Sequence, residues 1–382
     1  MKRKKVLVVF GTRPEAIKMF PVINELSRNK SFFLTKTCVT AQHRQMLDQV
    51  LELFSIKPDF DLNIMKRNQN ISVVTSKIIN EMKKIYEDFQ PDYVLVHGDT
   101  TTSMAASIAA FYEKIKICHI EAGLRTNNIY SPWPEEVNRQ IISVLSSLNF
   151  APTNESMKNL YKENKKNVFV TGNTVIDALF FIKDKIKKDK RFSKRIEEEL
   201  NKNYKYNRKK KFILVTGHRR ENFGEGFKNV CLALKKISEE NTSIDIVYPL
   251  HLNPKVKKPV ENYLGNIPNV HLIKPLSYET FIYLMQKSYV ILTDSGGIQE
   301  EAPSLGKPVL VMRNISERPE AIKAGTVKLV GTDFNKIIKE TQNLIDNKVF
   351  YKKMSQTHNP YGDGRASKRI INLLKKDAKS SL

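Results

Sequence analysis

Short apolar runs alternate along the chain with longer segments of helical periodicity, and this alternation restricts the possible folds more than any other feature. In the first half of the chain the apolar runs lie at residues 6–10, 33–39, 93–97, 115–120, 148–151 and 168–171. Between them, apolar side chains recur every three or four positions, as in residues 15–28 and 71–89. Such alternation predicts a parallel sheet with helices on both faces.

The same pattern begins again after a lysine-rich stretch that ends at Lys211. The second set of apolar runs lies at residues 212–216, 244–249, 270–273, 290–293, 309–311 and 326–329. A chain of 382 residues is long enough for two domains, each with its own core. The sequence therefore predicts an α/β protein with two doubly wound, Rossmann-like domains joined near Gly172. A further helix, expected at residues 366–376, could belong to either domain.

Composition excludes several classes of protein. The chain is 41% hydrophobic and 27% charged, as is usual for globular proteins, and no apolar run approaches the ~18 residues that span a bilayer. The basic N-terminus precedes an apolar run too short for a secretory signal. The three cysteines are widely spaced and match neither a disulfide framework nor a metal motif. We therefore expect a cytoplasmic protein without membrane contact.

The net charge of +24 raises the question of nucleic-acid binding. The basic residues, however, are scattered in short runs, and no recognised nucleic-acid module or aromatic stacking motif accompanies them. We expect a largely solvated basic surface and no nucleic-acid partner. A positive field would still assist the capture of an anionic substrate.

Polar side chains follow the predicted strands at the point where each strand ends. In doubly wound sheets, ligands bind at these carboxyl ends, where the strand order reverses. The clusters are Gly11-Thr12-Arg13, Gly98-Asp99, Glu121, His218-Arg219-Arg220, His251 and Asp294-Ser295-Gly296-Gly297. Because both domains carry such clusters, we expect the active site in a cleft between them.

Two carboxylates mark the stretch 118–139. Glu121 ends an apolar run, and Glu135 follows a loop in which Trp133 lies between two prolines. Together with Asp99 and His218, these acids could remove a proton from one face of a substrate and return it to the other. The alternative is an ordinary helix start, in which the dipole favours Glu135 and Glu136. We assign Glu136 to the helix start.

Two further clusters are suited to anions. Arg13 and Lys18 lie at the start of a predicted helix, where Gly11 would let a ligand approach the backbone. The turn Ser295-Gly296-Gly297 precedes another helix and could hold a diphosphate, with Glu301 one turn later facing two ribose hydroxyls. An ordinary capped helix and a glycine-rich turn are the alternatives.

Motifs for the common cofactors are missing from the sequence. There is no GxGxxG for NAD, no P-loop for ATP and no metal motif such as HExxH. The HGD sequence at residues 97–99 resembles a metal-ligand pair, but no second cluster of histidine and aspartate accompanies it. We expect neither cofactor nor metal.

Nine motifs in the same order make the chain similar to the non-hydrolysing UDP-N-acetylglucosamine 2-epimerases of bacteria over essentially its whole length. They are GTRPEAIKM (11–19), AQHRQMLDQ (41–49), HGDTTT (97–102), HIEAGLRT (119–126), SPWPEEVNR (131–139), TGHRRENFG (216–224), HLNP (251–254), TDSGGIQEEAP (293–303) and SERPEA (316–321). The resemblance implies a GT-B-like fold, with residues 1–172 plus 363–382 in the first domain and 173–362 in the UDP-binding second domain.

The resemblance also implies roles for individual residues. Those matching the family's catalytic positions are Asp99, Glu121, Glu135 and His218. Those matching its substrate-binding positions are Arg13, Lys18, Phe281, Ser295, Gly296, Gly297, Glu301 and Arg318. Those matching a regulatory site for a second, activating UDP-GlcNAc are Gln42, Gln45, Arg67, Glu135, Arg219 and His251. The chain departs from the family at Leu276, where a glutamine is usual near the uracil, and at Ser316, where threonine is usual.

The implied reaction is reversible epimerisation of UDP-GlcNAc to UDP-ManNAc at C2. UDP leaves by anti elimination to give 2-acetamidoglucal and then adds back, which supplies ManNAc units for surface polysaccharide. The resemblance further implies a homodimer. Three alternatives stay open: a hydrolysing epimerase that releases ManNAc and UDP, an epimerase of a modified UDP-amino sugar, and a non-catalytic protein that binds nucleotide sugars or anionic polymers.

Overall fold

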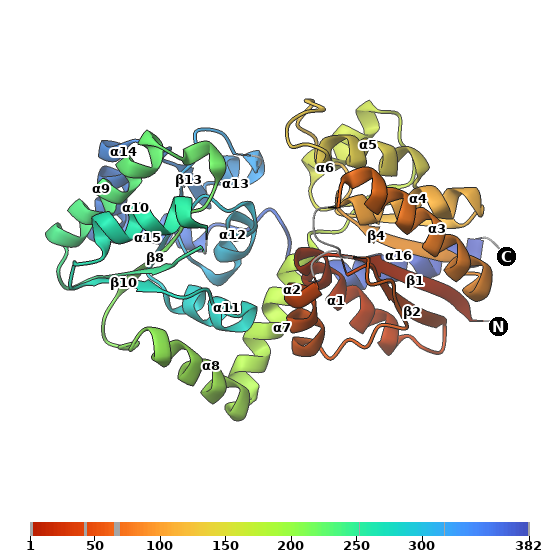
Figure 1. Ribbon diagram of the computed structural model, residues 1–382, viewed down its shortest axis with the longest axis horizontal. Helices are drawn as coiled ribbons and strands as arrows, with labels where there is room; N and C mark the ends of the chain where they lie inside the picture. The colour runs from red at the N-terminus through yellow and green to blue at the C-terminus, as the bar shows by residue number, and fades with distance from the viewer. Residues whose placement is uncertain (1–2, 42–43, 65–68, 252, 317, 381–382) are drawn as a thin grey trace. The chain divides into compact units, whose positions relative to one another are not determined.

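The computed structural model describes residues 3–41, 44–64, 69–251, 253–316 and 318–380, and the chain divides into two units. Unit 1 comprises Met1–Ala178 and Tyr361–Leu382, and unit 2 comprises Leu179–Pro360. Each unit contains one parallel sheet with helices around it (Figure 1). This architecture confirms the predicted fold class of two doubly wound, Rossmann-like units.

The sheet of unit 1 has seven strands in the order β3-β2-β1-β4-β5-β6-β7. Their bounds are β1 Lys4–Phe10, β2 Phe33–Val39, β3 Phe60–Asp61, β4 Tyr93–His97, β5 Lys116–Ile120, β6 Leu148–Ala151 and β7 Val168–Val170. The order reverses between β1 and β4, so the loops after these two strands meet at the switch point. Only β3, which is two residues long, was not predicted from the sequence.

The helices of unit 1 are α1 Arg13–Arg28, α2 Arg44–Leu53, α3 Ile71–Phe89, α4 Thr101–Tyr112, α5 Glu135–Leu145, α6 Asn154–Lys162, the beginning of α7 Thr174–Lys188, and α16 Ala366–Ser380. Most of them connect successive strands, whereas α7 leads out of the unit and α16 ends the chain. On one face of the sheet, the core lies against α3 and α4, where apolar strand residues such as Leu7 and Val96 meet the apolar faces of the helices. This burial supplies most of the stability of such a layer.

The C-terminal helix α16 packs on unit 1, although it follows all of unit 2 in the sequence (Figure 1). The side chain of Asp177 on α7 accepts hydrogen bonds from the N–H groups of Ala366 and Ser367 and so caps the start of α16. Near the other end, Asp377 accepts a hydrogen bond from the hydroxyl of Tyr93 (2.6 Å) and pairs with Lys116 (2.8 Å). These contacts hold α16 against β4 and β5.

The sheet of unit 2 has six strands in the order β10-β9-β8-β11-β12-β13. Their bounds are β8 Phe212–Thr216, β9 Asp245–Pro249, β10 Val270–Ile273, β11 Val290–Thr293, β12 Val309–Val311 and β13 Val327–Leu329. The helices are α8 Lys190–Asn203, α9 Glu225–Glu240, α10 Pro254–Leu264, α11 Tyr278–Lys287, α12 Gly296–Glu301, α13 Pro319–Ala324, α14 Phe334–Asp346 and α15 Lys348–Gln356. Here the order reverses between β8 and β11.

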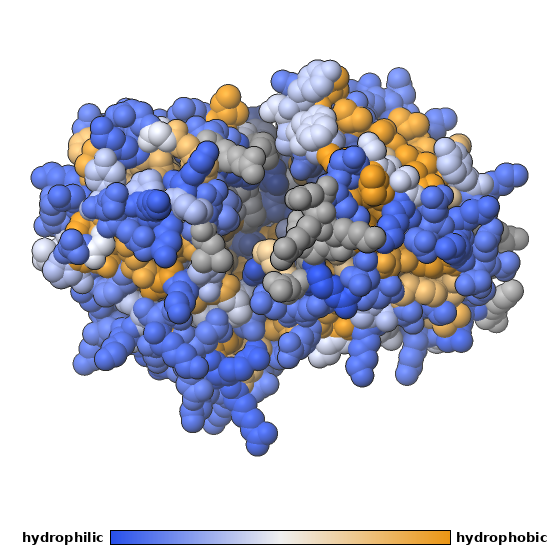
Figure 2. Space-filling view, viewed as in Figure 1, coloured by the Kyte–Doolittle hydropathy of each residue, from blue (hydrophilic) through white to orange (hydrophobic). Residues whose placement is uncertain are grey.

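Hydrophilic side chains cover most of the visible surface, with smaller hydrophobic groups between them (Figure 2). Over the part of the chain that the structure describes, no helix is both long enough and apolar enough to cross a membrane.

Candidate functional site

Glu121 lies at the end of β5 in a left-handed backbone conformation, with φ of 62°. This conformation is unusual for a residue other than glycine and, where it occurs, often accompanies function. The Nζ atom of Lys18, from α1, lies 2.5 Å from Oε2 of Glu121, and the Nδ2 atom of Asn173 donates a hydrogen bond of 2.7 Å to the same oxygen. The partners of this oxygen thus include one cation and one neutral donor.

Two buried histidines flank Glu121. The Nε2 atom of His97 lies 3.7 Å from Oε2 of Glu121, and that of His119 is 2.7 Å from the carbonyl oxygen of Gly98. Burial lowers the pKa of His97 to about 4 and that of His119 to about 3. Both imidazoles are therefore neutral near pH 7. Within the described ranges, Nε2 of His97 has no hydrogen-bond partner.

Asp99 follows β4, the neighbour of β5, and is held by Arg139 of α5. The Nη2 and Nε atoms of Arg139 lie 2.6 Å and 2.9 Å from Oδ2 of Asp99. Because His97 lies opposite Ile120 in the register of β4 and β5, Asp99 and Glu121 emerge from adjacent strand ends. The structure therefore places these two predicted acids at one edge of the sheet.

Glu136 begins helix α5 together with Glu135, as expected, but its side chain is fully buried. It accepts hydrogen bonds from the N–H groups of Thr126 (3.1 Å) and Asn127 (3.2 Å) and pairs with Arg139 (3.0 Å). Burial opposes the ionisation of Glu136, but these donors outweigh it, and its pKa lies below the ordinary value. Glu136 and Arg139 thus support Asp99. This role was not predicted from the sequence, although the three-residue spacing of Glu136 and Arg139 places them on one helix face.

Glu135 lies at the first position of α5 and is half-buried. Its Oε2 atom is buried and, as far as the described residues show, accepts no hydrogen bond. A buried carboxylate oxygen without a partner is costly, and a ligand hydroxyl would satisfy it. Trp133, in the loop before α5, is 62% exposed, so it contributes no core packing to this end of unit 1.

Glu15 is a second carboxylate that the sequence analysis missed. It is buried at the switch point and accepts hydrogen bonds from the N–H groups of Gly11 (3.0 Å) and Thr12 (2.8 Å) and from the hydroxyls of Thr100 (2.7 Å) and Ser103 (3.1 Å). Burial raises its pKa. The side chain joins the loop after β1 to the loop after β4. The signal was the capping box formed with Thr12 at the start of α1.

The packing of Gly11 differs from the sequence-based interpretation. A Cβ atom at this position would lie 2.2 Å from Oγ1 of Thr40 and 2.4 Å from Oγ1 of Thr102. Glycine is therefore required by neighbouring side chains of the protein itself. Arg13 opens α1 directly after this loop, while Lys18, one turn further on, pairs with Glu121.

In unit 2, His218 follows β8 and is held by Asp294, which follows β11. The fully buried carboxylate of Asp294 accepts hydrogen bonds from the N–H groups of His218 and Arg219, both at 2.8 Å. The ring of His218 stacks on that of His251, with centroids 5.3 Å apart. Burial lowers the pKa of His218 against the attraction of Asp294, and His251 and Arg219 lower it further. Asp294 lies in a motif that we noted, but we had not assigned it a role.

The start of α12 is surrounded by basic groups. A Cβ atom on Gly296 would lie 3.7 Å from Nη2 of Arg318 and 4.0 Å from Nη2 of Arg219. The Nε atom of Arg318 donates to Glu300 at 2.5 Å, which fixes one side of its guanidinium group. Free N–H groups at a helix start together with two guanidinium groups can accommodate a diphosphate. The structure therefore groups Ser295, Gly296, Gly297, Arg318 and Arg219.

Glu301 and Phe281 lie nearby in the same unit. Oε1 of Glu301 accepts a hydrogen bond of 2.7 Å from the hydroxyl of Tyr278, at the start of α11. Phe281 is on α11, three residues after Tyr278, and the two therefore share a helix face. An aromatic ring and a carboxylate at this end of the sheet suit a base and a ribose.

The predicted regulatory residues are only partly described. Gln42 and Arg67 lie outside the described residues, and for Gln45 only the backbone, in α2, is described. Arg219 and His251 both lie beside His218 in unit 2, and Glu135 lies in unit 1. The structure thus brings together two members of this set.

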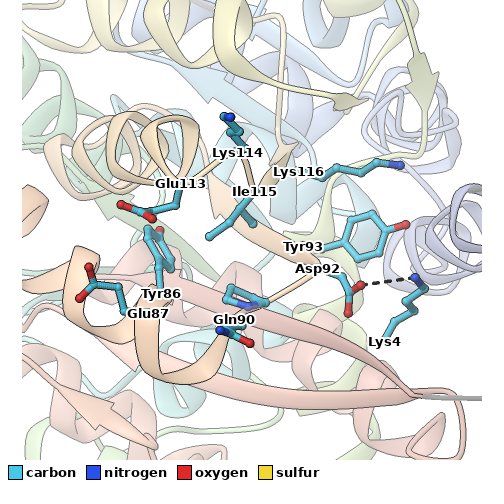
Figure 3. Close-up of a pocket in the computed structure, with 11 residues that line it drawn as sticks. Lys4, Tyr86, Glu87, Gln90, Asp92, Tyr93, Glu113, Lys114, Ile115 and Lys116 are labelled. Carbon is cyan, nitrogen blue, oxygen red and sulfur yellow. Dashed lines mark hydrogen bonds and ion pairs between the residues drawn. The ribbon is translucent and has the colours of Figure 1, made fainter.

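A separate pocket of about 500 Å³ lies at the opposite end of the unit 1 sheet (Figure 3). It is lined by residues where β1, β4 and β5 begin, including Lys4, Tyr93 and Lys116, and Lys4 pairs with Asp92 at 3.3 Å. No candidate residue lines it. In the described ranges there is also no group of three or more histidine, cysteine, aspartate or glutamate residues that could hold a metal ion.

Sequence comparisons identify the relatives of this chain. The family described as UDP-N-acetylglucosamine 2-epimerase matches residues 24–375. The chain is 61% identical to the UDP-N-acetylglucosamine 2-epimerase of Campylobacter jejuni over 373 residues, covering 97% of each chain. It is 55% identical to that of Escherichia coli K12 over 374 residues, covering 97% of this chain and 98% of the relative.

Comparison with solved structures gives the same family as the sequence comparisons. The UDP-GlcNAc 2-epimerase of Neisseria meningitidis, bound to UDP-GlcNAc, is 55% identical and has a TM-score of 0.89 over 97% of this chain and all of the other. That of Methanocaldococcus jannaschii, in complex with UDP-GlcNAc and UDP, is 31% identical, with a TM-score of 0.79 over 97% and 99% of the two chains. These similarities confirm the resemblance seen in the motifs: the chain belongs to the UDP-N-acetylglucosamine 2-epimerase family.

Proposed function

We propose that this protein interconverts UDP-GlcNAc and UDP-ManNAc without hydrolysis, by elimination of UDP to 2-acetamidoglucal and re-addition. The observation that carries the proposal is the pair of acids at adjacent strand ends, Asp99 and Glu121, each held by a basic side chain. The relative from Neisseria meningitidis, which is bound to UDP-GlcNAc, supports the choice of substrate.

The chemistry explains why acids are needed and no redox cofactor is required. The C2 proton of the sugar has no adjoining carbonyl, so it becomes acidic only as the bond between C1 and the diphosphate oxygen breaks. A carboxylate takes the proton, the C1–C2 double bond forms, and UDP leaves with the electron pair of the C–O bond. In the return step UDP attacks C1, and an acid delivers a proton to the opposite face of C2.

Each acid in the proposal has a distinct environment. Glu121 is held by Lys18 and Asn173, which favour its ionised form, and we assign it the role of base in one direction. Asp99 and Glu135 complete the set that exchanges protons. Oε2 of Glu135, which accepts no hydrogen bond from the described residues, supports a contact with the substrate. The neutral His218 would donate a hydrogen bond to the departing diphosphate.

Unit 2 would hold the nucleotide. We propose that Ser295, Gly296 and Gly297 bind the diphosphate with Arg318, that Glu301 accepts from the ribose hydroxyls and that Phe281 stacks near the uracil. Arg13 would contact the phosphate or sugar. The guanidinium groups around α12 support this assignment. The reaction would need a site from which water is excluded, because water would trap the glycal.

Three further proposals rest on the family. Gln42, Gln45, Arg67, Glu135, Arg219 and His251 would form a regulatory site for a second UDP-GlcNAc. The protein would act as a homodimer. Its product would supply ManNAc units for surface polysaccharide.

Proton NMR of UDP-GlcNAc with the protein in D2O tests the reaction. Epimerisation predicts deuterium at C2 of both epimers with the UDP linkage retained. Free N-acetylmannosamine would instead indicate hydrolysis, and an unchanged spectrum would refute both reactions.

Variants of the acids test the assignments in the same assay. Asp99→Asn, Glu121→Gln and Glu135→Gln should each reduce exchange by at least about a hundredfold, the usual contribution of a general acid or base, while UDP binding is retained. Glu113→Gln, at an exposed position of unit 1, is the matched control and should be as active as the parent. Near-normal exchange in any acid variant would remove that residue from the mechanism.

A further inference from the structure

The two segments that join the units meet beside Glu121. The chain leaves unit 1 along α7, which begins just after Asn173, and returns at Tyr361. The N–H group of Asn173 donates a hydrogen bond of 2.7 Å to the carbonyl oxygen of Tyr361. A Cβ atom on Gly362 would lie 3.4 Å from the Cα atom of Gly172, so the two backbones are in close contact. Asn173 thus lies where both joining segments are fixed to unit 1.

The orientation of the Asn173 side chain is determined by its neighbours. It is buried, and its Oδ1 atom accepts a hydrogen bond of 3.0 Å from the N–H group of Val175, at the start of α7. This leaves Nδ2 directed at Oε2 of Glu121, 2.7 Å away. A reversed amide would lose the bond to Val175 and place two oxygens in contact, so only one orientation satisfies both neighbours.

The other described groups near Glu121 make different contacts with it, and Nε2 of His97, 3.7 Å from Oε2, lies beyond hydrogen-bond distance. Lys18, from α1, supplies the positive charge. His97, from β4, and His119, from β5, are buried with lowered pKa values and are neutral. Lys18 reaches the carboxylate on a long flexible stem, whereas Asn173 has a short side chain fixed at its other end by the backbone of α7.

We propose that Asn173 is a positioning residue that fixes the carboxylate of Glu121 for proton transfer and links its position to the two segments that join the units. The proposal rests on the proposed function, in which Glu121 exchanges the C2 proton. A hydrogen-bond donor at this position stabilises the ionised carboxylate of Glu121 and fixes its orientation. Because Asn173 is attached to both joining segments, any shift of these segments moves the donor.

Two substitutions separate this role from simple helix capping. Asn173→Asp and Asn173→Ser both retain an oxygen that can accept from the N–H groups at the start of α7, and both residues are good caps. The aspartate variant, however, turns an acceptor and a negative charge toward Glu121, and the serine variant is too short to reach it. Asn70→Asp makes the same change at the exposed cap of α3 and is the matched control.

Deuterium exchange at C2 is measured from pH 5 to pH 9 for each variant, together with thermal unfolding. For Asn173→Asp we expect the acid limb of the kcat profile to move upward by about one pH unit or more, because a second carboxylate opposes the ionisation of Glu121. For Asn173→Ser we expect kcat to fall about tenfold or more, with KM changed less than about twofold. The Asn70→Asp profile should match the parent, and thermal unfolding confirms that each variant is folded at the assay temperature.

The outcomes are distinguishable. A profile of Asn173→Asp that superimposes on the parent would overturn the inference. If that variant does not fold, a kcat of Asn173→Ser equal to that of the parent would do the same. A parent protein that shows no exchange at C2 would overturn the proposed function, and this inference with it.

Discussion

At the scale of single residues, the buried histidines beside Glu121 connect the site to stability. His97 has a pKa of about 4 in the folded chain because burial disfavours its charged form, whereas an unfolded histidine titrates near 6.5. Between these values the unfolded chain binds a proton that the folded chain does not. The free energy of unfolding therefore falls as the pH is lowered from about 6.5 to about 4, by up to about 1.4 kcal/mol per pH unit for this side chain.

Replacing His97 tests this linkage. The substitution His97→Gln should make the decline of the unfolding free energy with falling pH less steep by up to that amount. Urea unfolding at several values between pH 4 and pH 7 measures the slope. The matched replacement His358→Gln, at an exposed position, should retain the parental slope. Equal slopes for His97→Gln and the parent would show that His97 is charged in the folded protein.

The candidate site residues at the strand ends could be predicted from the sequence. The buried carboxylates that hold them in place could not. Asp99 and Glu121 follow apolar runs, so the rule for doubly wound sheets indicated them directly. Asp294 and Glu136 also lie in noted motifs, but a carboxylate looks the same in sequence whether it faces water or accepts buried N–H groups. Only the tertiary structure shows that Asp294 holds the backbone of His218 and that Glu136 pairs with Arg139.

At the scale of elements, the start of α5 acts as an anchor for the loop that precedes it. Glu136, on the first turn, accepts hydrogen bonds from two N–H groups of that loop and forms an ion pair with Arg139. Arg139 in turn forms an ion pair with Asp99. Helix starts usually place acids in solvent, where the dipole favours them by less than about 1 kcal/mol. Here the same position connects a loop, a helix and a candidate catalytic acid.

The substitution Glu136→Gln should therefore cost more than a change at an ordinary helix start. We expect a loss of about 1–3 kcal/mol in the free energy of unfolding, because buried donors lose a charged acceptor, together with a kcat reduced about tenfold. Urea unfolding and the exchange assay measure the two effects. Glu155→Gln, in the first turn of α6, is the control and should change stability by less than about 0.5 kcal/mol. A Glu136→Gln variant that behaves like Glu155→Gln would contradict the anchoring role.

Helix α8 was not predicted, because its many charged residues obscure the helical spacing of its apolar residues. Residues 187–211 look like a lysine-rich stretch in the sequence, yet Asp189 caps a helix at Lys190–Asn203. Its buried residues Phe192, Ile196 and Leu200 recur every four positions, which is the signal that abundant lysine and glutamate obscured. Most other elements were predictable because their apolar runs are continuous and bounded by polar turns.

At the scale of the whole molecule, the net charge of +24 bears on the capture of substrate. If the substrate is an anionic nucleotide sugar, the positive field should raise kcat/KM at low ionic strength. We expect kcat/KM to fall several-fold between 0.01 M and 0.15 M salt, over which the Debye length shortens from about 30 Å to about 8 Å, with little change in kcat. Sucrose at equal osmolality is the control. A kcat/KM that is independent of salt would show that charge does not steer the substrate.

The position of α16 has a consequence for how the chain folds as it is synthesised. Unit 1 begins at the N-terminus but includes α16, which is made only after all of unit 2. Unit 2 is continuous in sequence, so its sheet and core can form while unit 1 still lacks the helix that covers Tyr93 and Lys116. Domains generally fold as units during synthesis. The unit that is translated first is therefore the unit that is completed last, when α16 covers its remaining face.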